Sequence, residues 1–133
     1  MAAGKYSFVI EQGSTVDFEI VYKDSNSNPV DLTDYQARMQ IRPSYGSSTI
    51  YMTLSSSLGP CGTGLNMSGS SGNKPPTSGS IGIYISAVSS SQLSFSEALY
   101  DLEIASGSGN CATVTRILEG KIRLSKNITL GSY

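Results

Sequence analysis

Two segments near the C-terminal end of the chain alternate apolar and polar residues. Residues 97–104 read Glu-Ala-Leu-Tyr-Asp-Leu-Glu-Ile, residues 113–125 show the same alternation, and a Gly/Ser/Asn turn at residues 106–110 separates them. Successive side chains of a strand point to opposite faces, so this pattern predicts two strands that each have one buried face. We expect the two strands to pair as an antiparallel hairpin that closes a sheet.

The rest of the chain also reads as short strands separated by turns. In residues 35–42 the apolar Ala37, Met39 and Ile41 would face inward while the intervening polar residues face solvent. No segment supports an amphipathic helix of three turns. Further strands are predicted at residues 6–10, 15–23, 49–54 and 81–85.

These elements predict an all-β fold, an immunoglobulin-like antiparallel β-sandwich of about eight short strands. We expect one domain over residues 1–133. Side chains on the inward faces of the predicted strands would form its core. They are Phe8, Ile10, Val16, Phe18, Ile20, Met39, Ile41, Ile81, Ile83, Ile85, Tyr100, Leu102, Ile104, Ile122 and Leu124.

Two stretches outside these strands have weaker patterns. We expect a flexible Ser/Gly/Pro-rich connection at about residues 55–80, with one short strand near residues 65–67. Residues 86–93 can hold a single helical turn, capped by Ser90 or Ser91, with the leucine at its end turned inward.

The chain contains no histidine, which is the commonest general base and the commonest metal ligand among side chains. Two cysteines without histidine do not make a zinc site, and a catalytic cysteine would lack its base. The net charge is −1 and the nine basic residues are scattered, so no basic stripe for nucleic acid is visible. We therefore expect a protein that is not an enzyme, with no catalytic, cofactor-binding or metal-binding residues.

The sequence shows no signal for export or for a membrane span. Its N-terminal residues lack the apolar core of a secretory signal, and no apolar run approaches the roughly 18 residues that cross a bilayer. We expect synthesis in a cytoplasm and no membrane partner. A disulfide between Cys61 and Cys111 is conceivable, although a cytosolic origin favours free thiols.

Acidic residues offer two further candidate sites. Residues 24–28 (Asp-Ser-Asn-Ser-Asn) begin like a calcium-binding loop, but Pro29 replaces the required glycine and no glutamate follows at the twelfth position, so an Asx turn is expected instead. Asp101, Glu103 and Glu119 would lie close together on neighbouring strands. They could form a carboxylate pair of the glycosidase type, but cross-strand pairing with Lys121, Arg116 or Arg123 is favoured.

The middle of the chain is nearly free of charge. Residues 43–96 contain a single charged side chain, Lys74. Serine can solvate such a surface, or other subunits can cover it, because lasting interfaces are depleted in charge and enriched in tyrosine and methionine. The candidate subunit-interface residues in this segment are Tyr45, Tyr51, Met52 and Tyr84.

Short motifs along almost the whole chain resemble those of bacteriophage tail proteins, in particular the N-terminal module of upper-baseplate proteins that anchor receptor-binding fibres. The motifs are Ile-Glu-Gln-Gly at residues 10–13, Asp-Phe-Glu-Ile at 17–20, Tyr-Lys-Asp at 22–24, Pro-Val-Asp-Leu-Thr-Asp-Tyr at 29–35, Ala-Arg-Met-Gln-Ile-Arg at 37–42, Tyr-Asp-Leu-Glu-Ile at 100–104, Leu-Glu-Gly-Lys-Ile-Arg-Leu at 118–124 and Ile-Thr at 128–129.

This resemblance implies a structural role without catalysis. We expect an adaptor or assembly protein of a phage tail, baseplate or neck, located in the virion and assembled in the host bacterial cytoplasm. Its partners would be other phage structural proteins and copies of itself. The anchor modules usually continue into a helical or fibrous extension, which this chain lacks, so assembly within the particle is expected rather than fibre-bearing.

Two alternatives remain open from the sequence. Within the structural class, the leading competitor is a capsid decoration protein. A carbohydrate-binding module would also use a β-sandwich, but it would need an exposed aromatic platform, and the chain has no tryptophan and eight scattered tyrosines.

Overall fold

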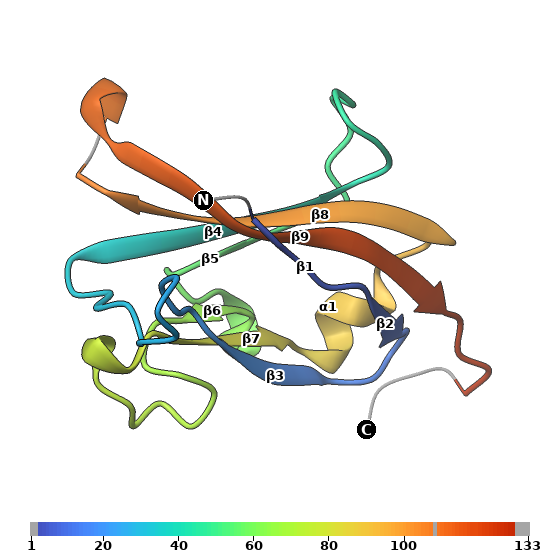
Figure 1. The fold of residues 1–133 in the computed structure, drawn as a ribbon. Helices are drawn as coiled ribbons and strands as arrows, with labels where there is room; N and C mark the ends of the chain where they lie inside the picture. Colours follow the sequence, from blue (N-terminus) through green and yellow to red (C-terminus); the bar gives the residue numbers. More distant parts are fainter. Residues whose placement is uncertain (1–2, 108, 130–133) are drawn as a thin grey trace.

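In the computed structural model, which describes residues 3–107 and 109–129, two β-sheets pack face to face (Figure 1). Three single-turn 3-10 helices and one α-helix lie in the connections. The strands are β1 (Gly4–Lys5), β2 (Phe8–Glu11), β3 (Val16–Val21), β4 (Tyr35–Arg42), β5 (Met52–Ser55), β6 (Gly64–Asn66), β7 (Ser80–Ile85), β8 (Glu97–Ser106) and β9 (Thr113–Ser125). The helices are η1 (Pro60–Gly62), η2 (Pro76–Ser78), α1 (Ala87–Ser91) and η3 (Gly109–Cys111).

The larger sheet contains the hairpin predicted from the C-terminal alternation. Its strands run in the order β1-β9-β8-β4-β5, and β8 pairs antiparallel with β9 from Glu97 opposite Arg123 to Ser106 opposite Thr113. β1 and β2 both pair with β9 in parallel, one after the other along its length. The sheet is therefore mixed, which differs from the purely antiparallel arrangement expected from the sequence, because β1 and β2 run parallel to β9 and then lead into β3 of the smaller sheet.

The smaller sheet has the order β3-β7-β6 and is antiparallel throughout. A sheet of order β5-β4-β8-β9 facing one of order β3-β7-β6 is the arrangement of the C′CFG and BED strands in immunoglobulin variable-type domains. The prediction of an immunoglobulin-like sandwich is confirmed. Both cysteines are exposed free thiols, so no disulfide joins the two sheets as it does in antibody domains.

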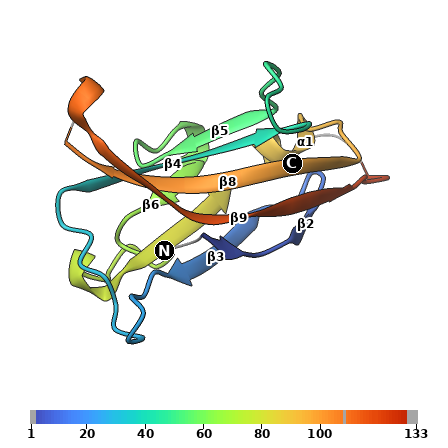
Figure 2. The same cartoon turned by 45° about the horizontal axis from the view of Figure 1, so that its top comes forward.

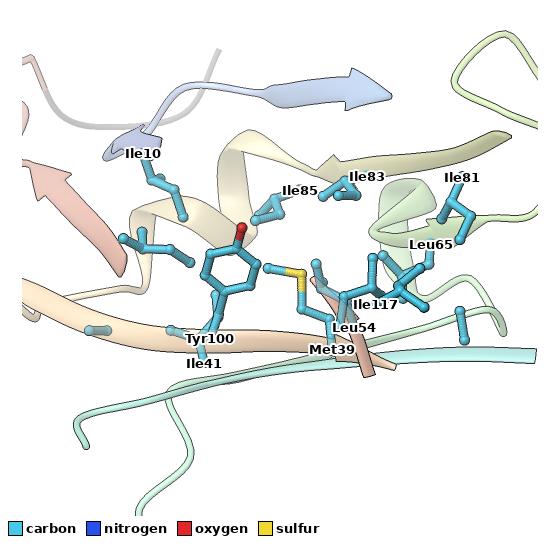
Figure 3. Packing of buried hydrophobic residues seen from close by; sticks show 14 of the residues in the cluster. Ile10, Met39, Ile41, Leu54, Leu65, Ile81, Ile83, Ile85, Tyr100 and Ile117 are labelled. Atoms are coloured by element: carbon cyan, nitrogen blue, oxygen red, sulfur yellow. The ribbon is translucent and has the colours of Figure 1, made fainter. Parts of the chain in front are cut away.

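The core lies between the sheets. Ile81, Ile83 and Ile85 of β7 are fully buried and face Met39 of β4 and Tyr100 of β8 (Figure 3). Four residues expected in the core are only partly buried, because β2 and β3 lie at sheet edges where one flank stays open; they are Phe8, Val16, Phe18 and Ile20. The core also contains residues that the sequence pattern did not single out: Leu32, Leu54, Leu65, Phe95, Ala98 and Ile117.

A β-bulge in β9 changes which side chains face the core. The β8–β9 register shifts between Leu102, which pairs with Leu118, and Glu103, which pairs with Arg116. The extra residue is Ile117, so the adjacent Ile117 and Leu118 both pack toward the core. The same shift leaves the residues on either side of this pair, Arg116 and Glu119, on the outer face of the sheet.

The single helical turn expected after β7 is present as α1, but its cap differs. The side chain of Ser86, not that of Ser90 or Ser91, accepts the hydrogen bond from the backbone N–H of Ser89. Ser90 is instead fully buried, and its hydroxyl donates to the carbonyl of Ser14 and accepts from the N–H of Gly13. These two hydrogen bonds fix the helix to the turn between β2 and β3. Leu93 is buried, as expected.

Gly120 allows the N-terminal strands to cross close to β9. A Cβ atom at Gly120 would lie 2.0 Å from the carbonyl oxygen of Tyr6. The buried hydroxyl of Tyr100, opposite Gly120 on β8, donates to the same carbonyl at 2.5 Å, and burial raises the pKa of that hydroxyl. The break between β1 and β2 is thus held by one close backbone approach and one buried hydrogen bond.

We predict that Gly120→Ala destabilises the protein by roughly 1–3 kcal/mol, because the methyl group forces the Tyr6 backbone away from β9. Gly4→Ala is the matched control, since its Cβ would meet its nearest atom only at 3.6 Å. The free energy of unfolding of both variants, measured in urea, checks this. Equal stability of the two variants would contradict the close approach.

We predict that Leu102→Asp prevents folding, whereas Ile20→Asp leaves a folded but weakened protein. Leu102 is fully buried, and an unpaired carboxylate there costs several kcal/mol, which is most of the stability of a small domain. Ile20 is only partly buried at an edge strand, so its carboxylate can reach water. Circular dichroism and solubility distinguish the two outcomes, and a stable Leu102→Asp variant would show that the β8 register is wrong.

Candidate interaction surfaces

One side of the sandwich is formed entirely by the uncharged middle of the chain. β5 is the last strand of the larger sheet and β6 is the last strand of the smaller one, and the two lie together on this side (Figure 2). Gly64 packs so tightly here that a Cβ atom on it would lie 2.7 Å from the carbonyl oxygen of Ser55. We call β5, β6 and the residues 49–51 and 56–63 that adjoin them the uncharged edge.

The opposite side of the sandwich has a different character. Its edge strands β1, β2 and β3 carry Lys5, Glu11, Asp17 and Glu19. Charged side chains on an edge strand discourage pairing with the strands of other molecules. The uncharged edge has no such protection, and it exposes the apolar side chains of Ile50 and Leu58 by 45% and 51%.

The four predicted interface residues do not form one patch. Tyr45 lies in the loop between β4 and β5, which rises above the outer face of the larger sheet, and its side chain is 83% exposed (Figure 1). Tyr51 and Met52 are half-buried at the uncharged edge, where the Tyr51 ring stacks on Phe95 with the ring centres 4.8 Å apart. Tyr84 lies on the outer face of the smaller sheet, in a shallow hollow.

Part of the connection between β5 and β7 is fixed by Glu19 of β3. The Glu19 carboxylate accepts a hydrogen bond from the backbone N–H of Ser70 at 2.9 Å and forms an ion pair with Lys74. These contacts hold the pKa of Glu19 below its usual value, the Lys74 hydrogen bond being the larger cause. The loop covers Gly82 of β7, where a Cβ atom would lie 2.7 Å from the Cα atom of Ser70. The only charge of residues 43–96 is therefore paired with β3, away from the uncharged edge.

The outer face of the larger sheet carries a network of ion pairs. Arg116 contacts Asp101 at 3.5 Å and Glu119 at 3.1 Å, which confirms the expected pairing with Arg116. Glu119 also binds Lys5 at 2.7 Å, and Glu103 pairs with Arg38 of β4. Lys121 and Arg123 form no ion pair with described residues. Sequence reasoning missed Arg38 and Lys5 because their positions depend on sheet order and on the parallel pairing of β1.

Two carboxyl groups in this network have opposite pKa shifts. Hydrogen bonds from Lys5 and Arg116 hold the pKa of Glu119 below its usual value. Burial raises the pKa of Asp101, and the more distant Arg116 only partly offsets this effect. Asp101 is thus the carboxylate of the network that is least well compensated by a cation.

The segment that begins like a calcium-binding loop, residues 24–28, forms a local turn. Asp24 accepts hydrogen bonds from the backbone N–H groups of Asn26 and Asn28, which is the expected Asx turn. Within the described residues, no cluster of three or more cysteine, aspartate and glutamate side chains could hold a metal ion. None of the helices in the described part of the chain is long and apolar enough to cross a membrane.

No protein-family model matches this sequence, and no curated protein is significantly similar to it.

The opposite pKa shifts predict that removing the charge of Glu119 and removing the charge of Asp101 change the stability of the fold in opposite directions. Glu119 binds its proton less tightly in the folded state, so its contribution to stability is present at neutral pH and is lost as the pH falls through its folded pKa. Asp101 binds its proton more tightly when folded, so its ionisation opposes folding at neutral pH and this penalty disappears on acidification.

We therefore expect Glu119→Gln to lower the urea midpoint at neutral pH and Asp101→Asn to leave it unchanged or raise it. Both differences from the parent should shrink toward about pH 3, where the carboxyl groups of the parent become protonated. An Asp101→Asn variant as destabilised at neutral pH as Glu119→Gln would show that Asp101 is a stabilising member of the network.

Proposed function

We propose that this protein is a non-enzymatic structural component of a phage virion, an adaptor or assembly protein of the tail, baseplate or neck that packs against neighbouring subunits through its uncharged edge. The observation that carries the proposal is the edge itself: two strand edges, one from each sheet, lie side by side in 54 consecutive residues whose single charge is paired elsewhere. The proposal that the particle is a phage rests on the resemblance of the short motifs along the chain to those of bacteriophage tail proteins.

An uncharged edge strand can accept a strand of another chain. Every second residue of an edge strand turns its backbone N–H and C=O groups outward, and these groups can pair with an extended segment of another chain. Thr53 and Ser55 offer small polar side chains there, and Ile50 and Leu58 add exposed apolar surface nearby. The residues of the edge carry no charge of their own that association would have to strip of water, and interface cores are likewise depleted in charge.

A negative charge placed at the centre of this edge tests the proposal. Thr53 is exposed on β5, and Thr53→Asp should fold normally but place a negative charge in the contact. We expect its incorporation into particles to fall roughly tenfold or more, as loss of a few kcal/mol of binding energy requires. Thr113→Asp is the matched control, because Thr113 is also an exposed strand residue but lies on β9.

The measurement is quantitative mass spectrometry of purified particles in which the variant replaces the parent protein. A density map of the particle then assigns the chain to the tail, baseplate, neck or capsid surface, which separates an adaptor from a decoration protein. Absence of the parent protein from purified particles would refute the virion role. Equal incorporation of the two variants, or an uncharged edge that faces open solvent in the particle, would refute the edge contact.

A further inference from the structure

A groove of about 300 Å³ lies on the outer face of the larger sheet, and none of the residues that line it belongs to the uncharged edge. The outward-facing residues of β4 and β8 form its floor, and residues 44–46 of the raised loop between β4 and β5 form one wall. Its volume is at the lower end of the range for small-molecule sites, about 300–1,000 Å³. The residues that define its chemistry are Arg38, Gln40, Arg42, Tyr45, Leu99 and Asp101.

The polar groups of the floor are held in place before any ligand arrives. Arg42 donates from Nε and Nη2 to the side-chain oxygen of Gln40, at 3.2 and 2.7 Å. Its third nitrogen, Nη1, donates to the carbonyl of Ser47 in the raised loop at 2.5 Å. One arginine therefore orients the Gln40 amide and ties the loop that carries Tyr45 to the sheet, which lowers the ordering entropy lost on binding.

Free hydrogen-bonding capacity remains at two neighbouring positions. The oxygen of Gln40 is used by Arg42, which directs its amide N–H donors away from Arg42, and among the described residues none accepts from them. Asp101 lies beside Gln40 in the sheet register and has only the 3.5 Å contact with Arg116. The groove thus presents an amide donor next to a carboxylate acceptor that is partly withdrawn from water, and the raised pKa of Asp101 agrees with this position.

The charge balance of the groove argues against an ionic ligand. Three carboxylates, Asp101, Glu103 and Glu119, line it together with Arg38 and Arg42, and Arg116 and Lys5 pair with the carboxylates from the side. An anion would meet the carboxylates, and a cation would meet guanidinium groups that are already engaged. A neutral ligand with many hydroxyl groups can instead donate to Asp101 and accept from Gln40 without displacing an ion pair.

Tyr45 supplies an aromatic ring at the wall of the groove. This residue is 83% exposed although it belongs to the wall of the groove, and Leu99 gives the floor an apolar surface. Aromatic rings of this kind present a large apolar face together with a polar tip. From these contacts we infer that the groove is a saccharide-binding site for a neutral sugar ring of hexose size, with Tyr45 stacking on the C–H face of the ring and Asp101 and Gln40 binding its hydroxyl groups.

This site goes beyond the assembly role and does not depend on it, because the groove and the uncharged edge share no residue. In the setting of a virion, such a site would allow the protein to contact glycans while the edge contacts neighbouring subunits.

Two-dimensional NMR of the isotopically labelled full chain tests the inference. D-glucose, D-galactose, D-mannose and N-acetyl-D-glucosamine are titrated separately to millimolar concentrations, with acyclic sorbitol as the control for hydroxyl groups without a ring face. We expect at least one sugar, and not sorbitol, to shift the backbone amides of residues 40–46 and 99–103. Tyr45→Ala and Asp101→Asn should each weaken binding roughly tenfold, which corresponds to about 1.4 kcal/mol.

Leu58→Asp in the uncharged edge lies outside the groove lining and should leave sugar binding unchanged, so the site can be judged separately from the assembly role. The inference is overturned if none of the four sugars shifts these amides, if sorbitol shifts them equally, or if Tyr45→Ala and Asp101→Asn bind as the parent does. Tyr45 is exposed and Asp101 opposes folding when ionised, so both variants are expected to fold.

Discussion

The burial of β7 between its neighbours is the interaction on which the rest of the structure depends. The smaller sheet has only three strands, and β6 contributes three residues to it, so its backbone hydrogen bonds alone would not hold it together. Ile81, Ile83 and Ile85 are fully buried, and each contributes roughly 1.5–3 kcal/mol when it leaves water. β3, β6 and the loop over Gly82 keep their places because β7 is anchored to the larger sheet.

The bulge at Ile117 affects both the core and the arrangement of charged side chains on the outer face of the larger sheet. It inserts one extra apolar side chain into the core, and it brings Arg116 and Glu119, three residues apart, to the same face of the sheet. In a regular strand these two side chains would point to opposite faces. Without the bulge, Arg116 could not bridge Asp101 and Glu119, and the balance of charges beside the groove would differ.

The sequence predicted best where periodicity alone decides the structure. The β8–β9 hairpin, the inward face of β4, the short strand at β6 and the buried Leu93 all followed from alternation or from a single apolar residue at the end of a turn. Leu32 and Phe95 were missed because they lie in connections without periodicity, and Phe18 and Ile20 were placed too deep because alternation does not show whether a strand lies at an edge.

The candidate surfaces were only partly visible in the sequence. The lack of charge in residues 43–96 could be read directly, but not the fact that this segment supplies both edge strands on one side of the sandwich. Three tyrosines of this uncharged segment, Tyr45, Tyr51 and Tyr84, lie on three different surfaces, because their positions depend on the paths of the loops and on the strand order. The groove was hidden altogether, because Gln40, Asp101 and Tyr45 come together only through the β4–β8 register and the raised loop.

The two surfaces share one structural unit, the hairpin of β4 and β5. Its second strand forms the free edge of the larger sheet, and its loop carries Tyr45 and receives the hydrogen bond from Arg42 to Ser47. A partner strand that pairs with β5 would restrain this hairpin without entering the groove, since the partner would lie in the plane of the sheet while the groove lies on its outer face. The two proposed contacts would therefore be separate in the fold. The edge contact would be made by backbone groups, which tolerate many partners, and the groove contact by oriented side chains, which would select a ligand by its shape and hydroxyl pattern.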